Sequence, residues 1–242
     1  MLKKKLIVAA LAASFAASAS AEDLSFSSNV TLASDYLYRG ISQTGKNPAV
    51  QGGFDLSHAS GLYAGVWGSS ISWLGDAGIP NSGTEIDTYV GYKGTAGDVS
   101  YDAGFLRYNY PGTYGTATKA DTNEVYGSVG YSFVSAKLSY SLGDLFGVAN
   151  ASGSTYLEFN VSYPMGDSGV TLGAHYGKQT YSGTTVDSAA TYSDYKLSAA
   201  KDFSGYVLTA AYSSTNAGAF YTNAQGDELG KGTLVLSLSR AM

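Results

Sequence analysis

Hydrophobic and polar residues alternate with a period of two along most of the chain. Val99 and Tyr101, for example, alternate with Ser100 and Asp102. This period is typical of a strand that has one apolar and one polar face. The pattern predicts about twelve strands, with ten to fourteen possible. The segments are 24–38, 50–56, 62–73, 85–93, 98–105, 124–133, 136–142, 156–163, 170–176, 194–199, 206–213 and 233–239. In segment 62–73 the two possible apolar faces compete, so its orientation stays open.

Long and short connections alternate between these segments. The long ones are 40–49, 74–83, 109–121, 143–153, 178–192 and 214–230, and the short ones are 58–61, 94–97, 134–135, 164–168 and 203–205. Bacterial outer-membrane barrels have short periplasmic turns, longer extracellular loops and an even number of strands. The spacing therefore predicts an all-β fold, a transmembrane antiparallel up-and-down β-barrel. A soluble β-sandwich is the alternative, although its connections have no reason to alternate in length.

The N-terminus has the pattern of a secretory signal peptide. Lys3, Lys4 and Lys5 precede a short apolar stretch, and Ala19-Ser20-Ala21 fits the small-residue cleavage signal. The apolar stretch is shorter than the roughly 20 residues that a spanning helix needs. We therefore expect residues 1–21 to be a cleaved signal peptide and residues 22–242 to form the barrel domain, in the bacterial outer membrane.

Composition supports strands and narrows the possible partners. The chain has 31 Gly, 21 Tyr and only four Pro, and aromatic residues favour a pleated surface. It has no Cys, so disulfides and thiolate chemistry are excluded. Without the three signal-peptide lysines, 11 Lys and Arg face 19 Asp and Glu, a net charge of −8. Nucleic acid is therefore not an expected partner. The partners expected for an outer-membrane barrel are outer-membrane lipid and the barrel-assembly machinery.

The polar face of the predicted strands carries mostly ionisable side chains. The candidates for lining the lumen are Asp35, Asp55, Glu85, Asp87, Asp102, Glu124, Glu158, His175, Asp194 and Lys196. Eight of these ten are acidic, and acidic rings in a pore select for cations. The sequence predicts a porin-like channel for passive passage of small polar solutes or ions, with a preference for cations. Two alternatives stay open: carboxylates paired internally in a neutral or plugged lumen, and a closed barrel with a structural or surface-binding role.

Motifs for catalysis or cofactor binding are weak. Gly40 to Asn47 approaches a phosphate-binding loop, but Asn47 stands where Ser or Thr is needed, and Pro48 follows instead of a helix. We interpret it as a Gly-rich surface loop, and Gly166 to Gly169 as a turn. His58 and His175 fall in different places, which predicts no metal site, and His175 is expected to be a hydrogen-bonded wall residue. We expect no enzyme activity and no cofactor.

One part of the chain resembles a known family. The stretch SDYLYRGISQT at 34–44, followed by PAVQGGFDLSH at 48–58 and GLYAGVW at 61–67, resembles the TorF-type porins, exported proteobacterial proteins of unknown function. The resemblance is dense over residues 30–68 and implies an outer-membrane barrel without naming a solute. The chain departs from most such barrels at its C-terminus, where Met242 replaces the aromatic residue that helps to recruit the assembly machinery.

Overall fold

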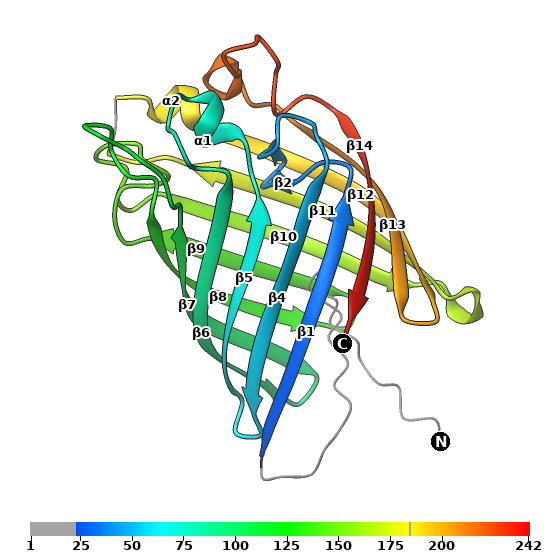
Figure 1. The fold of residues 1–242 in the computed structure, drawn as a ribbon. Helices are drawn as coiled ribbons and strands as arrows, with labels where there is room; N and C mark the ends of the chain where they lie inside the picture. Colours follow the sequence, from blue (N-terminus) through cyan, green and yellow to red (C-terminus); the bar gives the residue numbers. More distant parts are fainter. Residues whose placement is uncertain (1–22, 184) are drawn as a thin grey trace.

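The chain forms a closed barrel of twelve antiparallel strands (Figure 1). The computed structural model describes residues 23–183 and 185–242. The wall strands are β1 (Leu24–Ala33), β4 (Ala49–His58), β5 (Leu62–Ser70), β6 (Thr84–Ala96), β7 (Val99–Asn109), β8 (Thr122–Tyr131), β9 (Val134–Ser141), β10 (Thr155–Pro164), β11 (Val170–Thr180), β12 (Tyr192–Phe203), β13 (Tyr206–Thr215) and β14 (Thr233–Ala241). Each strand pairs with its neighbour along the chain, and β1 closes the barrel on β14, with Leu32 opposite Leu238. The predicted fold class is confirmed.

Six long connections lie at one end of the barrel and five short turns at the other, where the C-terminus also lies (Figure 1). We number the long connections as loops 1 to 6: residues 34–48, 71–83, 110–121, 142–154, 181–191 and 216–232. They contain the short strands β2 (Leu37–Tyr38) and β3 (Ile41–Ser42), the helices α1 (Trp73–Asp76) and α2 (Asp187–Ala190), and the 3-10 turn η2 (Ala219–Tyr221); a second 3-10 turn, η1 (Gly166–Ser168), lies between β10 and β11. The predicted signal peptide lies outside the described residues.

Three predicted boundaries are corrected. The first wall strand ends at Ala33 instead of Tyr38, and the third ends at Ser70 instead of Trp73, because the chain leaves the wall at both points to enter loops. The turn predicted at 134–135 is at Ser132–Phe133, since Tyr131 pairs with Val134 and Ser132 has a φ of 55°. A positive φ allows the chain to reverse within two residues.

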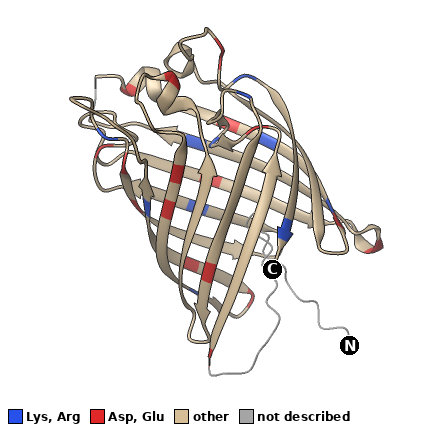
Figure 2. Cartoon of the chain, viewed as in Figure 1, with Lys and Arg blue, Asp and Glu red and all other residues tan. Residues whose placement is uncertain are grey.

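The outer face of the wall is a belt of apolar side chains. Leu138 and Leu172, which the alternation places outward, are 48% and 40% exposed, and Leu197 is 66% exposed. An apolar surface of this extent is typical of contact with lipid. Charged side chains are scattered over the strands and loops, with acidic and basic positions interspersed (Figure 2). Within the described residues, no helix is long and apolar enough to cross a bilayer.

The inner face pairs tyrosine rings with glycines on neighbouring strands. Tyr89 covers Gly65, and its hydroxyl donates to Asp55 at 2.5 Å. Tyr63 covers Gly91 in the same way, and Tyr126 covers Gly104. Because these glycines have no Cβ, the rings lie flat against the wall. The abundance of both residue types therefore has a packing explanation that composition alone did not supply.

Replacing Gly65 with alanine should destabilise the barrel by about 1–3 kcal/mol, as expected for overpacking. A Cβ at this position would lie 2.5 Å from the Tyr89 ring, which its hydrogen bond to Asp55 holds in place. Urea unfolding in lipid vesicles measures the loss. Gly127→Ala is the matched control, since nothing lies within 4 Å of the added methyl group. Equal stability of the two variants would contradict the ring-over-glycine packing.

Candidate functional site

Loop 1 leaves the wall after Ala33 and folds into the barrel. β2 and β3 form a two-residue antiparallel ladder within it, and the tip between them is Arg39 and Gly40, with φ values of 47° and 77°. Ser42 and Thr44 are buried. The surface loop expected at Gly40 to Asn47 is therefore corrected in part: Lys46 and Asn47 are exposed, whereas Ser42 and Thr44 are buried and bond within the loop.

Asp35 organises loop 1 and does not belong to the wall. Its carboxylate accepts hydrogen bonds from Ser42 Oγ at 2.7 Å and from Thr44 Oγ1 at 3.0 Å. Burial raises the pKa of the Asp35 carboxyl, an effect that these two hydrogen bonds oppose. The placement of Asp35 among the wall residues is corrected for this reason: β1 ends two residues earlier, and the carboxylate turns toward its own loop.

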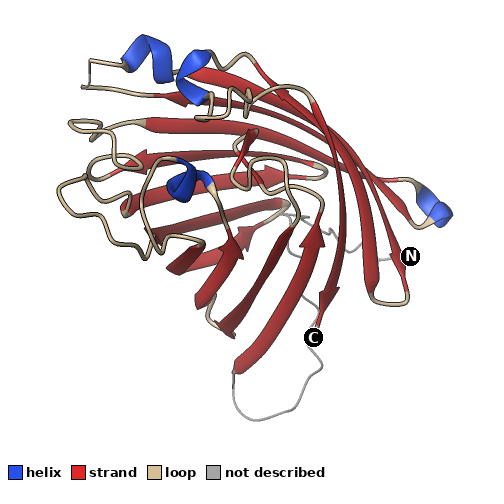
Figure 3. Cartoon of the chain, turned by 45° about the horizontal axis from the view of Figure 1, so that its top comes forward, coloured by secondary structure: helices blue, strands red, loops and turns tan. Residues whose placement is uncertain are grey.

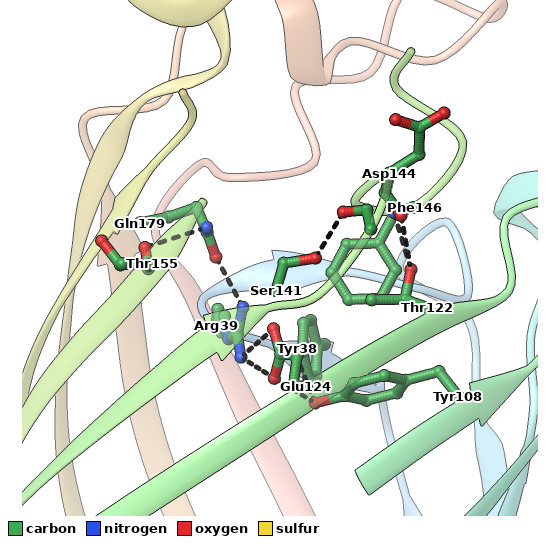
Figure 4. Close-up of polar contacts among 11 residues, drawn as sticks. Tyr38, Arg39, Tyr108, Thr122, Glu124, Ser141, Asp144, Phe146, Thr155 and Gln179 are labelled. Atoms are coloured by element: carbon green, nitrogen blue, oxygen red, sulfur yellow. Dashed lines mark hydrogen bonds and ion pairs between the residues drawn. The ribbon is translucent and has the colours of Figure 1, made fainter. Parts of the chain in front are cut away.

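The tip of loop 1 is held by a buried ion pair (Figure 4). Arg39 Nη2 lies 2.7 and 2.9 Å from the two carboxylate oxygens of Glu124 on β8, and Nη1 donates to Gln179 Oε1 on β11 at 2.7 Å. The guanidinium also lies over the rings of Tyr38 and Tyr156. The two charged side chains are only 6% and 3% exposed. Such a pair is stable only when its remaining donors are satisfied, and Gln179 and the two rings meet that need.

Gly40 brings the loop against strands β12 and β13 of the wall. A Cβ at this position would lie 2.6 Å from Thr215 Cγ2 and 2.7 Å from Asp194 Cβ, so only glycine fits between the loop and strands β12 and β13. Loop 1 thus starts at β1, reaches β8 and β11 through Arg39, and touches β12 and β13 through Gly40. It crosses the lumen from one side of the wall to the other.

An aromatic cluster surrounds loop 1 at the loop end of the barrel. Tyr36 donates to Glu85 at 3.2 Å and packs edge-on against Trp67, and Tyr38 shares a 2.7 Å hydrogen bond with Tyr108. The buried members of this cluster are Tyr36, Ala49, Ile71, Leu74, Tyr108, Tyr110, Tyr114 and Ala120. This core lies inside the barrel mouth, where the alternation predicted only a polar lumen.

Four of the predicted lumenal residues lie beside loop 1: Asp194 next to Gly40, and Glu85, Asp87 and Glu124. Glu85, Asp87 and Glu124 are 1%, 7% and 2% exposed. Glu124 is neutralised by Arg39, whereas Glu85 Oε2 and Asp87 Oδ1 have no hydrogen-bond partner among the described residues. The structure brings these three buried side chains together with loop 1 on the inner face of the wall.

The other predicted lumenal residues face the interior in two groups. Asp55 and Asp102 accept hydrogen bonds from Tyr89 and Tyr63 at 2.5 and 2.6 Å. His175 contacts Asn160, Asp194 and Tyr156 within 3.0 Å, and lies 3.7 Å from Glu158. Lys196 is opposite His175 in the register of β11 and β12. Most of these carboxylates therefore have an internal partner, usually a tyrosine hydroxyl and not a basic side chain.

Arg39 is the functional residue whose position the sequence does not reveal. In the sequence, the alternation that includes Leu32 continues through Tyr36 and Tyr38. It therefore places Arg39 on the polar face of a first strand that is longer than β1. One residue in the sequence signals that the first wall strand ends before Arg39. Ser34 is polar, although the alternation would place it on the lipid-facing side, and it follows the last residue of β1. The constriction could be located only from the fold.

Comparisons with known proteins agree with the fold. A membrane protein solved in work on the mechanism of in-meso crystallization matches with a TM-score of 0.52 and 7% identity, over 90% of this chain and 83% of that chain. An outer membrane channel from Pseudomonas putida F1 gives a TM-score of 0.48 and 14% identity, over 92% and 96% of the two chains. OccK5 (OpdH) of Pseudomonas aeruginosa gives 0.45 and 14%, over 92% and 68%.

No curated protein matches the chain. A family model does match, and it covers residues 16–242, nearly the whole sequence. The chain therefore belongs to the bacterial protein family of unknown function named Gcw_chp.

Proposed function

We propose that this protein is a porin-like channel of the bacterial outer membrane and that loop 1 controls passage through its lumen. The observation that carries the proposal is the Arg39–Glu124 ion pair, which fixes a loop across an otherwise polar, closed-walled barrel. Loop 1 pairs with no wall strand: its tip is held to the wall by side chains, and backbone hydrogen bonds join Ser42 to loop 6 and Gln43 to loop 2. It can therefore be displaced while the wall stays closed. The solutes would be small and polar, since the inner face below loop 1 carries ionisable and hydroxyl side chains.

Several features together support the proposed location in the bacterial outer membrane. The apolar belt suits lipid, and the signal-peptide pattern suits export. The sequence that resembles the TorF-type porins is dense over residues 30–68, a range that includes the whole of loop 1. Under this proposal the loop end faces outward and the turn end faces the periplasm.

Planar-bilayer recording of the refolded protein tests the proposal. We expect brief or small conductance steps from the wild-type barrel and larger ones when loop 1 is displaced. Failure to conduct in both forms would favour a second candidate function, a closed barrel with a surface-binding role. The aromatic cluster in the barrel mouth is the observation that favours this second function.

The orientation predicts which sites can be labelled on intact cells. Epitopes inserted at Asn81 in loop 2 or Asn150 in loop 4, both exposed, should bind antibody without permeabilisation. An epitope in the Ser132–Phe133 turn should bind only after the outer membrane is permeabilised. Labelling of that turn on intact cells would reverse the proposed orientation.

If the barrel conducts, we expect it to prefer cations. Seven predicted acidic residues face the interior, whereas the basic groups there are Arg39, Lys93, Lys137 and Lys196. A charged, low-dielectric passage concentrates ions of the opposite sign. The measurement is the reversal potential across a KCl gradient.

The choice of variants for this test follows from burial. Asp102→Asn with Glu158→Gln should move the reversal potential toward chloride, because both side chains are half-buried on the inner face below loop 1. Asp227→Asn with Glu228→Gln changes two exposed loop 6 residues and serves as the control. Anion preference in the wild type would contradict the proposed polarity of the lumen.

A further inference from the structure

The six long loops close over a cavity at the loop end of the barrel, the end that Figure 3 turns toward the viewer. Its volume is about 380 Å³, within the range of small-molecule sites. Each loop, or the strand end beside it, contributes: Tyr38 from loop 1, Trp73 from loop 2, Tyr110 from loop 3, Phe146 from loop 4, Tyr181 from loop 5 and Phe220 from loop 6. Convergence of all six loops on one space is what a dedicated site requires.

The lining is rich in aromatic side chains. Eight of the described lining residues are aromatic, and Tyr192 and Tyr221 add two rings to those above. Rings in this cavity already contact one another edge-on, as Trp73 does with Tyr110 at 5.4 Å and Tyr192 with Tyr221 at 4.8 Å. Aromatic rings favour such edge-on or offset contacts with a further ring. The cavity lining is therefore suited to a flat, apolar ligand.

The polar groups of the lining are largely committed to the protein. Gln179 bonds Arg39 and Thr155, Gln43 bonds the carbonyl of Ile41, and Ser42 bonds Asp35. Tyr221 donates to the carbonyl of Ala190. A sugar needs many hydrogen bonds and would find few of these groups available, so the lining disfavours it.

The charge of the lining also restricts the guest. Asp76 is the one charged side chain among the described lining residues, so an anionic guest would meet a like charge. Burial raises the pKa of Tyr181 to about 12, so this hydroxyl stays neutral at physiological pH.

We propose that this cavity binds a small, uncharged aromatic molecule, with its ring among the loop aromatics. The cavity adjoins the loop 1 tip, because Tyr38 and Gln179 both line it and both contact Arg39. Binding does not depend on conduction, so this site can exist whether or not the barrel is a channel.

Intrinsic fluorescence provides the test, because the chain has only two tryptophans, Trp67 and Trp73. In full-length protein refolded into lipid vesicles, Trp67→Phe leaves Trp73 as the reporter. The probe is 4-nitrobenzyl alcohol, a neutral aromatic quencher. We expect saturable quenching, and we expect Ala77→Phe combined with Ala224→Phe, both in the lining, to weaken binding by about tenfold or more. Ala117→Phe, on exposed loop 3, should leave the affinity unchanged.

Three outcomes would overturn the site. Quenching that rises linearly without saturation would mean collision or partition into lipid. Saturable quenching that the two cavity substitutions do not weaken would place the probe elsewhere. Equal quenching by the anion 4-nitrobenzoate, or displacement of the probe by maltose, would contradict the proposed ligand chemistry. Unchanged Trp73 emission of the substituted proteins without probe shows that the loops keep their fold.

Discussion

Replacing Arg39 with alanine should give a barrel that conducts more than the wild type and is less stable. Arg39 joins loop 1 to Glu124 and Gln179 on the far wall, so its loss frees the loop tip. The substitution also leaves Glu124 buried without its counter-charge, and breaking a buried pair in this way typically costs about 3–5 kcal/mol. Single-channel recording measures the first effect, and urea unfolding in vesicles measures the second.

A matched control separates this effect from general loss of a charge. Arg107 pairs with Asp121 at 3.1 Å, but its side chain is 39% exposed and lies away from loop 1, so Arg107→Ala should change conductance little and stability by at most about 1 kcal/mol. Replacing both Arg39 and Glu124 with alanine should restore part of the stability while keeping the higher conductance. Equal conductance of Arg39→Ala and wild type would show that the ion pair does not hold the passage closed.

Replacing Leu138 with arginine should cost about 2–4 kcal/mol if the residue lies near the bilayer midplane. Leu138 is half-exposed on the outer face and is flanked in register by Leu157 and Gly127, so the charge would enter lipid. The measurement is the free energy of unfolding in vesicles of defined lipid thickness.

The control must face the lumen and have room for the new side chain. Ser139, the next residue, faces inward but is buried between Tyr126 and Tyr156, so arginine would not fit there. Ser128 on β8 faces inward, is only partly buried and lies opposite Asp102 on β7, whose carboxylate offsets the neighbouring Lys137, so Ser128→Arg should be tolerated much better. Similar losses at Leu138 and Ser128 would point to a soluble core on the outer side.

The alternation was sufficient to predict the wall, because a closed barrel gives each strand one lipid face and one lumenal face. It assigned Leu138 and Leu172 outward and Glu158 inward from parity alone. It could not orient segment 62–73, since Leu62, Ala64 and Val66 compete there with Tyr63 and Trp67. The structure resolves this, because Tyr63 bonds Asp102 inside the barrel and Leu62 is exposed outside.

The constriction could not be predicted in the same way. Loop 1 folds inward because Arg39 bonds Glu124, which is 85 residues away in the chain, and Gln179, which is 140 residues away. Local periodicity contains no information about such pairs. Parity placed Glu124 inside the barrel and treated it as one of several pore carboxylates, whereas its partner neutralises it.

The tyrosines illustrate a second limit. Tyr131 and Tyr163, near strand ends, are exposed on the outer face, as suits an interface where the ring is apolar and the hydroxyl stays wet. Tyr36, however, lies inside the barrel, where its hydroxyl bonds Glu85. Whether a tyrosine faces lipid or a carboxylate depends on its strand's parity and on the end of that strand, which composition does not specify.

Under the proposed function, loop 1 and not the wall limits passage through the barrel. Single-channel recording of a shortened barrel tests it most directly: residues 35–47 are replaced by a short Asn-Gly turn, and β-sheet content is checked by circular dichroism. We expect the shortened barrel to show a larger and steadier conductance than the wild type, because the wall remains closed and the loop is gone. A folded barrel without loop 1 that conducts no more than the wild type would contradict the proposed function.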